Sequence, residues 1–165
     1  MVYRVYVEKK KGLDNEARSL KNELVSLLGI ASLENVRILN RYDVEKIEKA
    51  YKLARNAHAD QKRATGEPYI IHPVAAALTV VQLGMDTDTV CAALLHDVVE
   101  DAGITAEQIE TEFGKRVEEL VLSETENKRA DLPADATWEL RKKEVVELLK
   151  STSDIDVKKL YLSDK

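Results

Sequence analysis

The stretch Leu94-Leu95-His96-Asp97-Val98-Val99-Glu100-Asp101 decides how this chain is interpreted. It closes an apolar run over residues 87–101 that predicts one helix, and it ends that run with four ionisable side chains. Ionisable groups in apolar surroundings are costly unless something pairs them. His96, Asp97 and Glu100 share one face at helical spacing. An imidazole beside a carboxylate suits a divalent first-row metal, and Glu100 and Asp101 could position or deprotonate a water molecule.

A metal needs more ligands than His96 and Asp97, and two other residues are candidates. His72 precedes Pro73, so we expect its backbone to be extended just before a helix start. Asp164 lies on the otherwise apolar stripe of the last predicted helix, where a carboxylate needs a partner. The candidate metal site therefore consists of His72, His96, Asp97 and Asp164, with open positions for water and substrate.

The pattern from Asp43 onward predicts only helices. The first of them covers residues 43–61, and we interpret His58 on its apolar stripe as a hydrogen-bonded core residue. Thr105 and Gln108 have the spacing of a capping box, as do Ser153 and Asp156. The further predicted helices cover residues 73–84, 87–101, 105–122 with an interruption at Gly114, 138–150 and 153–165.

Residues 1–42 show a different pattern, which predicts strand, helix and strand. Tyr3, Val5 and Val7 alternate with other residues at the period of a half-buried strand. A helical repeat follows and stops at Gly29, and a second short strand ends near Tyr42. Such a small sheet is marginal alone, so we expect it to pack on the rest of the chain or on another copy through its sheet edge.

Composition limits the classes of function. The chain has 165 residues, of which 44% are hydrophobic, and a net charge of −5. Residues 44–165 carry 17 Lys and Arg against 24 Asp and Glu, which argues against a nucleic-acid partner. No apolar run approaches the roughly 20 residues of a membrane span. The amino terminus has no signal-peptide pattern, and the single cysteine, Cys91, excludes an intrachain disulfide. We therefore expect a cytoplasmic protein without a membrane partner.

Several stretches together resemble the landmarks of RelA/SpoT-type HD hydrolase domains. They are His58-Ala59-Asp60-Gln61-Lys62-Arg63-Ala64-Thr65-Gly66-Glu67-Pro68-Tyr69-Ile70-Ile71-His72-Pro73, the stretch Leu94 to Asp101, Phe113-Gly114, and Leu160-Tyr161-Leu162-Ser163-Asp164-Lys165. The resemblance covers about residues 43–165, and its compact form is similar to small alarmone hydrolases of the Mesh type. It implies an HD-domain helical bundle, so the whole chain is expected to be mainly α.

The resemblance also implies an activity, which is removal of the 3′-pyrophosphate from ppGpp or pppGpp with Mn²⁺ or a similar ion as cofactor. The metal ligands that it implies are His72, His96, Asp97 and Asp164. The groups that it implies for the attacking water are Glu100 and Asp101. Arg63 is implied to lie against the guanosine nucleotide, and Thr125 and Lys128 occupy positions where related sequences keep polar groups near the site.

This chain departs from the family pattern at two places. The family usually continues after the Asp-Lys pair, here Asp164-Lys165, into a Leu-x-Asn-x-Arg stretch, so we expect a domain that is short at its carboxyl end. Ala64 stands where close relatives often have Lys or Arg, which removes one phosphate contact. Two alternatives therefore stay open: a catalytically weak module for nucleotide binding or oligomerisation, and an HD phosphatase for another nucleotide.

Residues 1–43 resemble a second family. The segments Val2 to Lys10, Gly12 to Ala17 and Val36 to Asp43 are similar to the PurS-like amino terminus of formylglycinamidine ribonucleotide synthase. Only the first strand-helix-strand half of such a domain is present, so the resemblance implies a docking or homo-oligomerisation element over residues 1–42. The expected organisation is this half-domain followed by an HD-type phosphohydrolase domain over residues 43–165.

Overall fold

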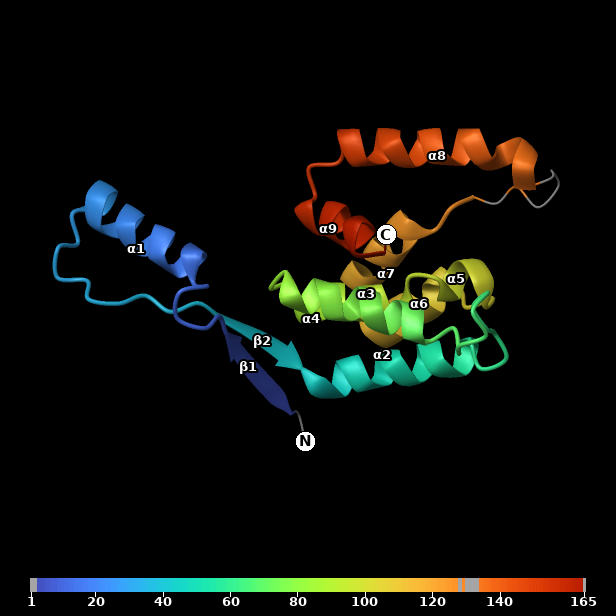
Figure 1. The fold of residues 1–165 in the computed structure, drawn as a ribbon, viewed down its shortest axis with the longest axis horizontal. Helices are drawn as coiled ribbons and strands as arrows, with labels where there is room; N and C mark the ends of the chain where they lie inside the picture. Colours follow the sequence, from blue (N-terminus) through green and yellow to red (C-terminus); the bar gives the residue numbers. More distant parts are fainter. Residues whose placement is uncertain (1–2, 128, 130–133, 165) are drawn as a thin grey trace. The chain divides into compact units, whose positions relative to one another are not determined.

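The computed structural model describes residues 3–127, 129 and 134–164. The chain divides into two compact units, Met1–Val44 and Glu45–Lys165, called here the amino-terminal unit and the HD unit. Figure 1 shows that the only sheet among the described residues is two-stranded and that the other elements are helices. The predicted fold class, a mainly α chain with a small strand-helix-strand element, is confirmed.

The amino-terminal unit has one helix between its two strands. Strand β1 (Arg4–Glu8) pairs antiparallel with β2 (Leu39–Asp43), and Arg4 lies opposite Asp43. Helix α1 (Asn15–Leu28) connects them and stops at Gly29, as predicted. Gly29 has a φ of 68°, a left-handed conformation that a glycine adopts without steric cost and that ends many helices.

Side chains of this unit are largely exposed. Among its described residues, Ala17 and Tyr42 are the only buried ones, and all five residues of β1 are exposed. The alternating pattern therefore predicted the strand correctly, and within this unit its apolar face is uncovered: Val5 and Val7 keep 48% and 42% of their surface exposed. The physical reason is that two strands give a narrow sheet, which buries a face only where another layer covers it.

Helix α4 (Thr87–Leu95) lies at the centre of the HD unit. Its residues from Thr89 to Leu95 are all buried, which explains why this segment is apolar on every side. Helices α3 (Ile71–Gln82) and α7 (Lys115–Glu124) pack against it, and α9 (Ile155–Asp164) contacts α3, α4 and α7. The ends of α3, α4 and α9 are therefore brought together, although they are far apart in the sequence (Figure 1).

Local sequence signals set the start and end of other helices. The capping box is confirmed: the Thr105 hydroxyl accepts a hydrogen bond from the Gln108 backbone, and the Gln108 side chain accepts one from the Thr105 N–H. Within the described part of the chain, no helix combines the length and apolarity of a membrane span. The remaining helices are α2 (Val44–Ala57), α5 (Val98–Asp101), α6 (Ala106–Phe113) and α8 (Ala134–Ser151).

Two local expectations are wrong. The helix predicted over residues 87–101 is interrupted at His96 and Asp97, where Nδ1 of His96 donates a hydrogen bond to the Ala93 carbonyl at 2.9 Å. The second correction concerns the start of α9, where the side chain of Asp154, rather than Ser153, accepts the N–H of Asp156 at 2.9 Å. Asp154 immediately precedes α9, so its carboxylate reaches the unpaired N–H groups of the first turn.

Candidate metal centre

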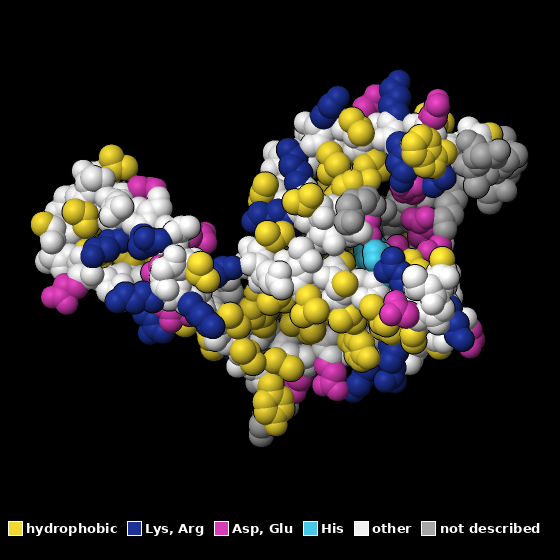
Figure 2. Space-filling view, viewed as in Figure 1, with side chains coloured by type: hydrophobic (Ala, Val, Ile, Leu, Met, Phe, Trp, Pro, Cys, Tyr) yellow, Lys and Arg dark blue, Asp and Glu magenta, His cyan; other side chains and the backbone are white. Residues whose placement is uncertain are grey.

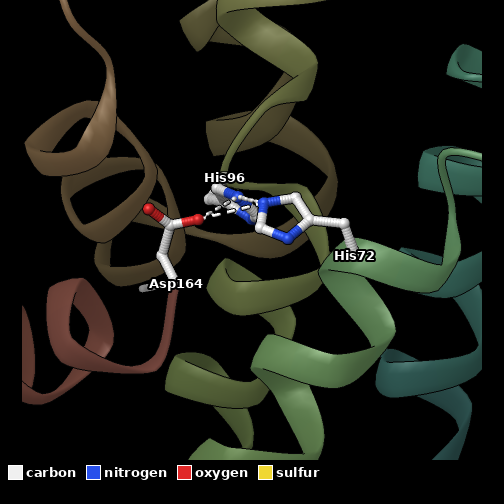
Figure 3. A group of neighbouring side chains, drawn as sticks. All are labelled: His72, His96 and Asp164. Atoms are coloured by element: carbon white, nitrogen blue, oxygen red, sulfur yellow. Dashed lines mark hydrogen bonds and ion pairs between the residues drawn. The ribbon is translucent and has the colours of Figure 1, made fainter. Parts of the chain in front are cut away.

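Three side chains from three helix ends point toward one another (Figure 3). His72 is the second residue of α3, His96 directly follows α4, and Asp164 is the last residue of α9. Their donor atoms all lie within 4.8 Å of one another. Oδ1 of Asp164 is 3.0 Å from Nε2 of His72 and 3.3 Å from Nε2 of His96, so one carboxylate oxygen approaches both rings.

Asp97 adds a fourth group to this set. Its Oδ2 lies 3.0 Å from Nε2 of His96 and 3.5 Å from Nε2 of His72. The same oxygen accepts a hydrogen bond of 2.7 Å from the hydroxyl of Tyr69. The structure thus brings together all four residues that the sequence analysis selected as candidate ligands.

The donor set fits a divalent cation. Nε2 of His72 and Nε2 of His96 face each other at 3.2 Å, and two neutral imidazoles with lone pairs at this distance require a proton or a cation to join them. Nδ1 of His96 donates to the Ala93 carbonyl, which leaves Nε2 as the ligand atom, the arrangement typical of metal-binding histidines. Ligands bound about 2.1 Å from one ion lie roughly 3.0–3.4 Å apart, close to the separations observed here.

The electrostatics of the set also favour positive charge. Burial alone lowers the pKa of His96, but its hydrogen bonds to Asp164 and Asp97 outweigh burial and raise this pKa to about 10. Burial raises the pKa of the Asp97 carboxyl, whereas the hydrogen bonds and charge of His96, with the hydrogen bond from Tyr69, bring it below its usual value. A group of side chains that retains a proton so strongly offers the same favourable environment to a metal ion.

The backbone around His72 differs from the sequence prediction. We expected an extended residue before Pro73, but His72 is helical, and its N–H donates to the Tyr69 carbonyl at 3.0 Å. Pro73 is the third residue of α3, where a backbone N–H has no partner within the helix, so its missing donor costs nothing. This start of α3 places Tyr69 and His72 on the same side, with their ring centroids 5.8 Å apart.

A cavity of about 230 Å³ adjoins the donor set. Glu100 lines it, and one oxygen of its carboxylate, Oε2, accepts the backbone N–H of Glu126 at 3.1 Å. Asp101 is exposed and is not among the described residues that line this cavity, so its predicted action on the attacking water stays a prediction. The described lining consists of His96, Asp97, Glu100, Glu124, Glu126, Lys142, Tyr161 and Asp164.

A second cavity, of about 380 Å³, shares His72 with the donor set. Arg63 and Lys62 are exposed residues of its wall, and Tyr69 lines it as well. Figure 2 shows a histidine side chain in a hollow of the HD unit, with acidic side chains and a Lys or Arg side chain beside it. Two cations, Lys62 and Arg63, thus line the cavity that shares His72, whereas the cavity beside His96 is lined by five carboxylates and Lys142.

None of the three predicted substrate contacts, those of Arg63, Thr125 and Lys128, is tested. Thr125 lines a different cavity, of about 260 Å³, and its hydroxyl donates to the Val121 carbonyl at 3.0 Å. Its neighbours Glu124 and Glu126 line the cavity beside the donor set. Lys128 lies outside the described residues. A contact of either side chain with a nucleotide therefore stays a prediction.

Sequence reasoning missed three residues around the donor set: Tyr69, Glu126 and Lys142. Tyr69 could have been predicted, because it stands three positions before His72 and its hydroxyl needs a polar partner when it is partly buried. Lys142 comes from α8 and binds Glu126, which follows α7. No spacing in the sequence indicates such a contact, because the two residues meet only when α8 folds back.

Comparison with known proteins identifies the family. A model of the HD domain family matches residues 50–165. A guanosine-3′,5′-bis(diphosphate) 3′-pyrophosphohydrolase of Aquifex aeolicus is 41% identical over 145 residues, which cover 86% of this chain and 20% of the relative. The protein of the same description from Vibrio cholerae is 47% identical over 83 residues, covering 50% of this chain and 12% of the relative. The chain thus spans a fifth or less of the length of these relatives.

Two solved structures are similar as well. The structure of a metazoan ortholog of SpoT, described as hydrolysing ppGpp, has a TM-score of 0.62 and 30% identity and covers 72% of this chain and 65% of that one. The protein lmo0812 from Listeria monocytogenes has a TM-score of 0.51 and 38% identity, over 60% and 59% of the two chains. The family match contains all four residues of the donor set. This chain belongs to the HD domain family.

Proposed function

We propose that the HD unit is a metal-dependent phosphohydrolase that removes the 3′-pyrophosphate of ppGpp or pppGpp. The observation that carries this proposal is the convergence of His72, His96 and Asp164 at three helix ends, beside a cavity that Glu100 lines. The similarity to guanosine-3′,5′-bis(diphosphate) 3′-pyrophosphohydrolases supports the choice of substrate.

The proposed ligands of the ion are His72, His96, Asp97 and Asp164. Two imidazoles with two carboxylates suit several divalent first-row metals, and we propose Mn²⁺, because carboxylate and water ligands favour it. When bound, such an ion lowers the pKa of a coordinated water toward neutrality and offsets the negative charge of a phosphate. The protein contributes a rigid donor set, since Asp97 is oriented by the Tyr69 hydroxyl and His96 by the Ala93 carbonyl.

Glu100 is the proposed base for the attacking water. The N–H of Glu126 fixes one oxygen of the Glu100 carboxylate at the wall of the cavity, so the group keeps one orientation. Water forms a bond to the phosphorus attached to the ribose 3′ oxygen, Glu100 takes its proton, and the bond between that phosphorus and the 3′ oxygen breaks. The 3′ oxygen takes up a proton, and pyrophosphate leaves. The exposed Asp101 stays a predicted second group for this water.

The cavity of Arg63, Lys62 and His72 is the proposed nucleotide site. A planar guanidinium can stack on a base or form paired hydrogen bonds with it, whereas an ammonium acts on phosphate as a point charge. Both cations are exposed, so a ligand reaches them without displacing core residues. Contacts of Thr125 and Lys128 with the nucleotide, a cytoplasmic location and the lack of a nucleic-acid partner are further predictions of the sequence.

The test is pyrophosphate release from ppGpp by the purified protein loaded with Mn²⁺. We expect Asp97→Ala to lower kcat by about 1000-fold or more, because it removes a proposed ligand, and the exposed Asp60→Ala to have no effect. A wild-type rate no higher than that of Asp97→Ala would refute the proposal.

Parallel assays separate the two alternatives. Turnover of GTP or NADPH without turnover of ppGpp assigns the site to an HD phosphatase for another nucleotide. If the protein binds Mn²⁺ and nucleotide stoichiometrically but turns over none of these nucleotides, the site belongs to a binding module.

We also propose that residues 1–42 pair with a second copy of this chain through the edge of their sheet. The specific observation is that, among the described residues, each strand has a partner on one side only, while Val5 and Tyr6 keep 48% and 58% of their surface exposed. The test is the molar mass by light scattering. Deletion of residues 1–42 is expected to change the assembly state, and an assembly state that the deletion leaves unchanged contradicts this proposal.

A further inference from the structure

His58 is a buried histidine outside the candidate donor set. It follows α2 directly and keeps only 2% of its surface exposed. Its Nδ1 lies 2.9 Å from Oε1 of Gln61, and because an amide oxygen only accepts, Nδ1 carries the proton. Nε2 is then an acceptor, and among the described residues this buried nitrogen has no hydrogen-bond partner. A residue needed only for packing gains nothing from such a nitrogen, since an apolar side chain fills the same space without that cost.

The first contact of His58 leads to the candidate ligand Asp97. The imidazole ring lies against the ring of Tyr69, with their centroids 4.7 Å apart and their planes inclined by 36°. The Tyr69 hydroxyl donates to Oδ2 of Asp97 at 2.7 Å. Burial and then the neighbouring Asp97 raise the pKa of Tyr69, so its hydroxyl is always a donor near neutral pH. The position of the His58 ring therefore limits where this donor, and with it the carboxylate, can lie.

The second contact of His58 leads to the other end of the acidic segment. The His58 N–H fixes the side-chain amide of Gln61, whose Nε2 donates to the backbone carbonyl of Asp101 at 3.1 Å. The backbone carbonyl of Gln61 also accepts the N–H of Tyr69 at 3.1 Å. Since Glu100 and Asp101 end α5, the orientation of the Gln61 amide supports the helix turn that presents Glu100 to the cavity.

We infer that His58 is a positioning residue of the metal site, through two separable contacts. Its ring keeps Tyr69 against Asp97, and its Nδ1–H keeps Gln61 against the backbone of Asp101. The expected effect of His58 on turnover rests on the proposed function. The expected effect of His58 on metal affinity requires only that the site binds an ion. It replaces the interpretation of His58 as a core residue without a further role.

Two substitutions separate the two contacts. His58→Asn keeps a donor near the position of Nδ1 and removes the ring, so we expect Mn²⁺ affinity, measured by titration of the metal-free protein, to fall about 10-fold. His58→Phe keeps a ring against Tyr69 and removes the donor. We expect it to retain Mn²⁺ affinity within about twofold and to lower kcat for ppGpp about 10-fold at unchanged KM.

A double-mutant cycle with Tyr69→Phe tests the first contact. Tyr69→Phe alone should lower Mn²⁺ affinity as much as His58→Asn does, and the double variant should lose no more than either single one. Mn²⁺ affinity equal to that of the wild type in both His58→Asn and Tyr69→Phe, or activity that falls only with the folded fraction measured by circular dichroism, overturns the inference. If a His58 variant does not fold, Tyr69→Phe and Gln61→Leu test the two contacts instead. The inference is contradicted if Tyr69→Phe leaves the Mn²⁺ affinity unchanged and Gln61→Leu leaves kcat for ppGpp unchanged.

The failure of the proposed function is distinguishable from the failure of this inference. Wild-type protein that binds Mn²⁺ but does not hydrolyse ppGpp refutes the substrate. The coupling between His58 and Tyr69 in metal affinity is measured without any nucleotide, so it still supports or overturns the positioning role.

Discussion

The two units place the apolar residues of their helices in opposite surroundings. Leu95 on α4 is wholly buried among other helices, whereas Leu27, on the helical repeat of α1, keeps 78% of its surface exposed. The spacing of apolar residues predicted α1, and a continuous apolar run predicted the helix that contains α4. Periodicity thus tells which element forms, but not whether the folded chain supplies the surface that covers its apolar residues.

Ionic contacts hold different elements in the two units. Arg18 binds Asp14 within one helix end, four residues away. Arg116 on α7 binds Asp154 with both guanidinium nitrogens and also Asp156, which fixes the start of α9 from a distant part of the chain. The contact of Arg116 therefore orients an element that carries the site, since α9 ends at Asp164. In the amino-terminal unit, the ionic contact between Arg37 and Glu8 joins the segment before β2 to β1.

The largest expected difference between the units is in core truncation. Leu95→Ala is expected to lower the free energy of unfolding by about 3 kcal/mol, because it leaves a cavity in a packed interior. The matched Leu27→Ala removes the same atoms from an exposed position and is expected to cost less than about 0.5 kcal/mol. Urea unfolding followed by circular dichroism measures both. A large effect of Leu27→Ala would indicate that another surface covers α1.

The next largest effect is expected for the arginine pairs. Arg116→Ala leaves the carboxylates of Asp154 and Asp156 without their cation, so we expect a loss of about 1–2 kcal/mol in the free energy of unfolding. We also expect weaker Mn²⁺ binding, because α9 carries Asp164. Arg18→Ala is the control and should cost below about 0.5 kcal/mol. Equal losses in the two variants would remove this distinction between the units.

A smaller effect on the free energy of unfolding is expected when the pH is lowered. The hydrogen bond from Arg116 lowers the pKa of Asp154 to about 2. Because this pKa lies below that of the unfolded chain, the stabilisation is complete above pH 4 and is lost as pH falls from about 4 to 2. After allowance for solvent screening, it amounts to about 1 kcal/mol. The difference in urea midpoint between wild type and Asp154→Asn should shrink over this interval, and a constant difference would contradict the assignment.

The smallest effect is expected for removal of most of the amino-terminal unit. Deletion of residues 1–42 should change the melting temperature of the HD unit by less than about 2 °C, because the two units have separate sets of contacts. Its Mn²⁺ content should stay the same, since all four candidate ligands lie in the HD unit. Calorimetry and metal analysis measure these quantities. A clear fall in either would show that the HD unit depends on residues 1–42.

Local signals and the candidate ligand residues were open to prediction from the sequence. Gly29 ended α1 and Thr105 capped α6 because these effects act over a few bonds of the chain. The interruption at His96 and the cap by Asp154 escaped prediction, because each depends on which of several nearby hydrogen-bond partners is used.

The sequence by itself determined that the chain is mainly helical, that it carries a small sheet at its start, and that two histidines and two aspartates are its candidate ligands. Only the tertiary structure decided that these four meet, that Tyr69 and His58 stand behind them, and that the apolar side chains of β1 are exposed. The physical reason is the distance along the chain over which each interaction acts. Caps, turns and periodicity depend on neighbours in the chain, whereas the donor set and the cover over an apolar face depend on how helices pack across many residues.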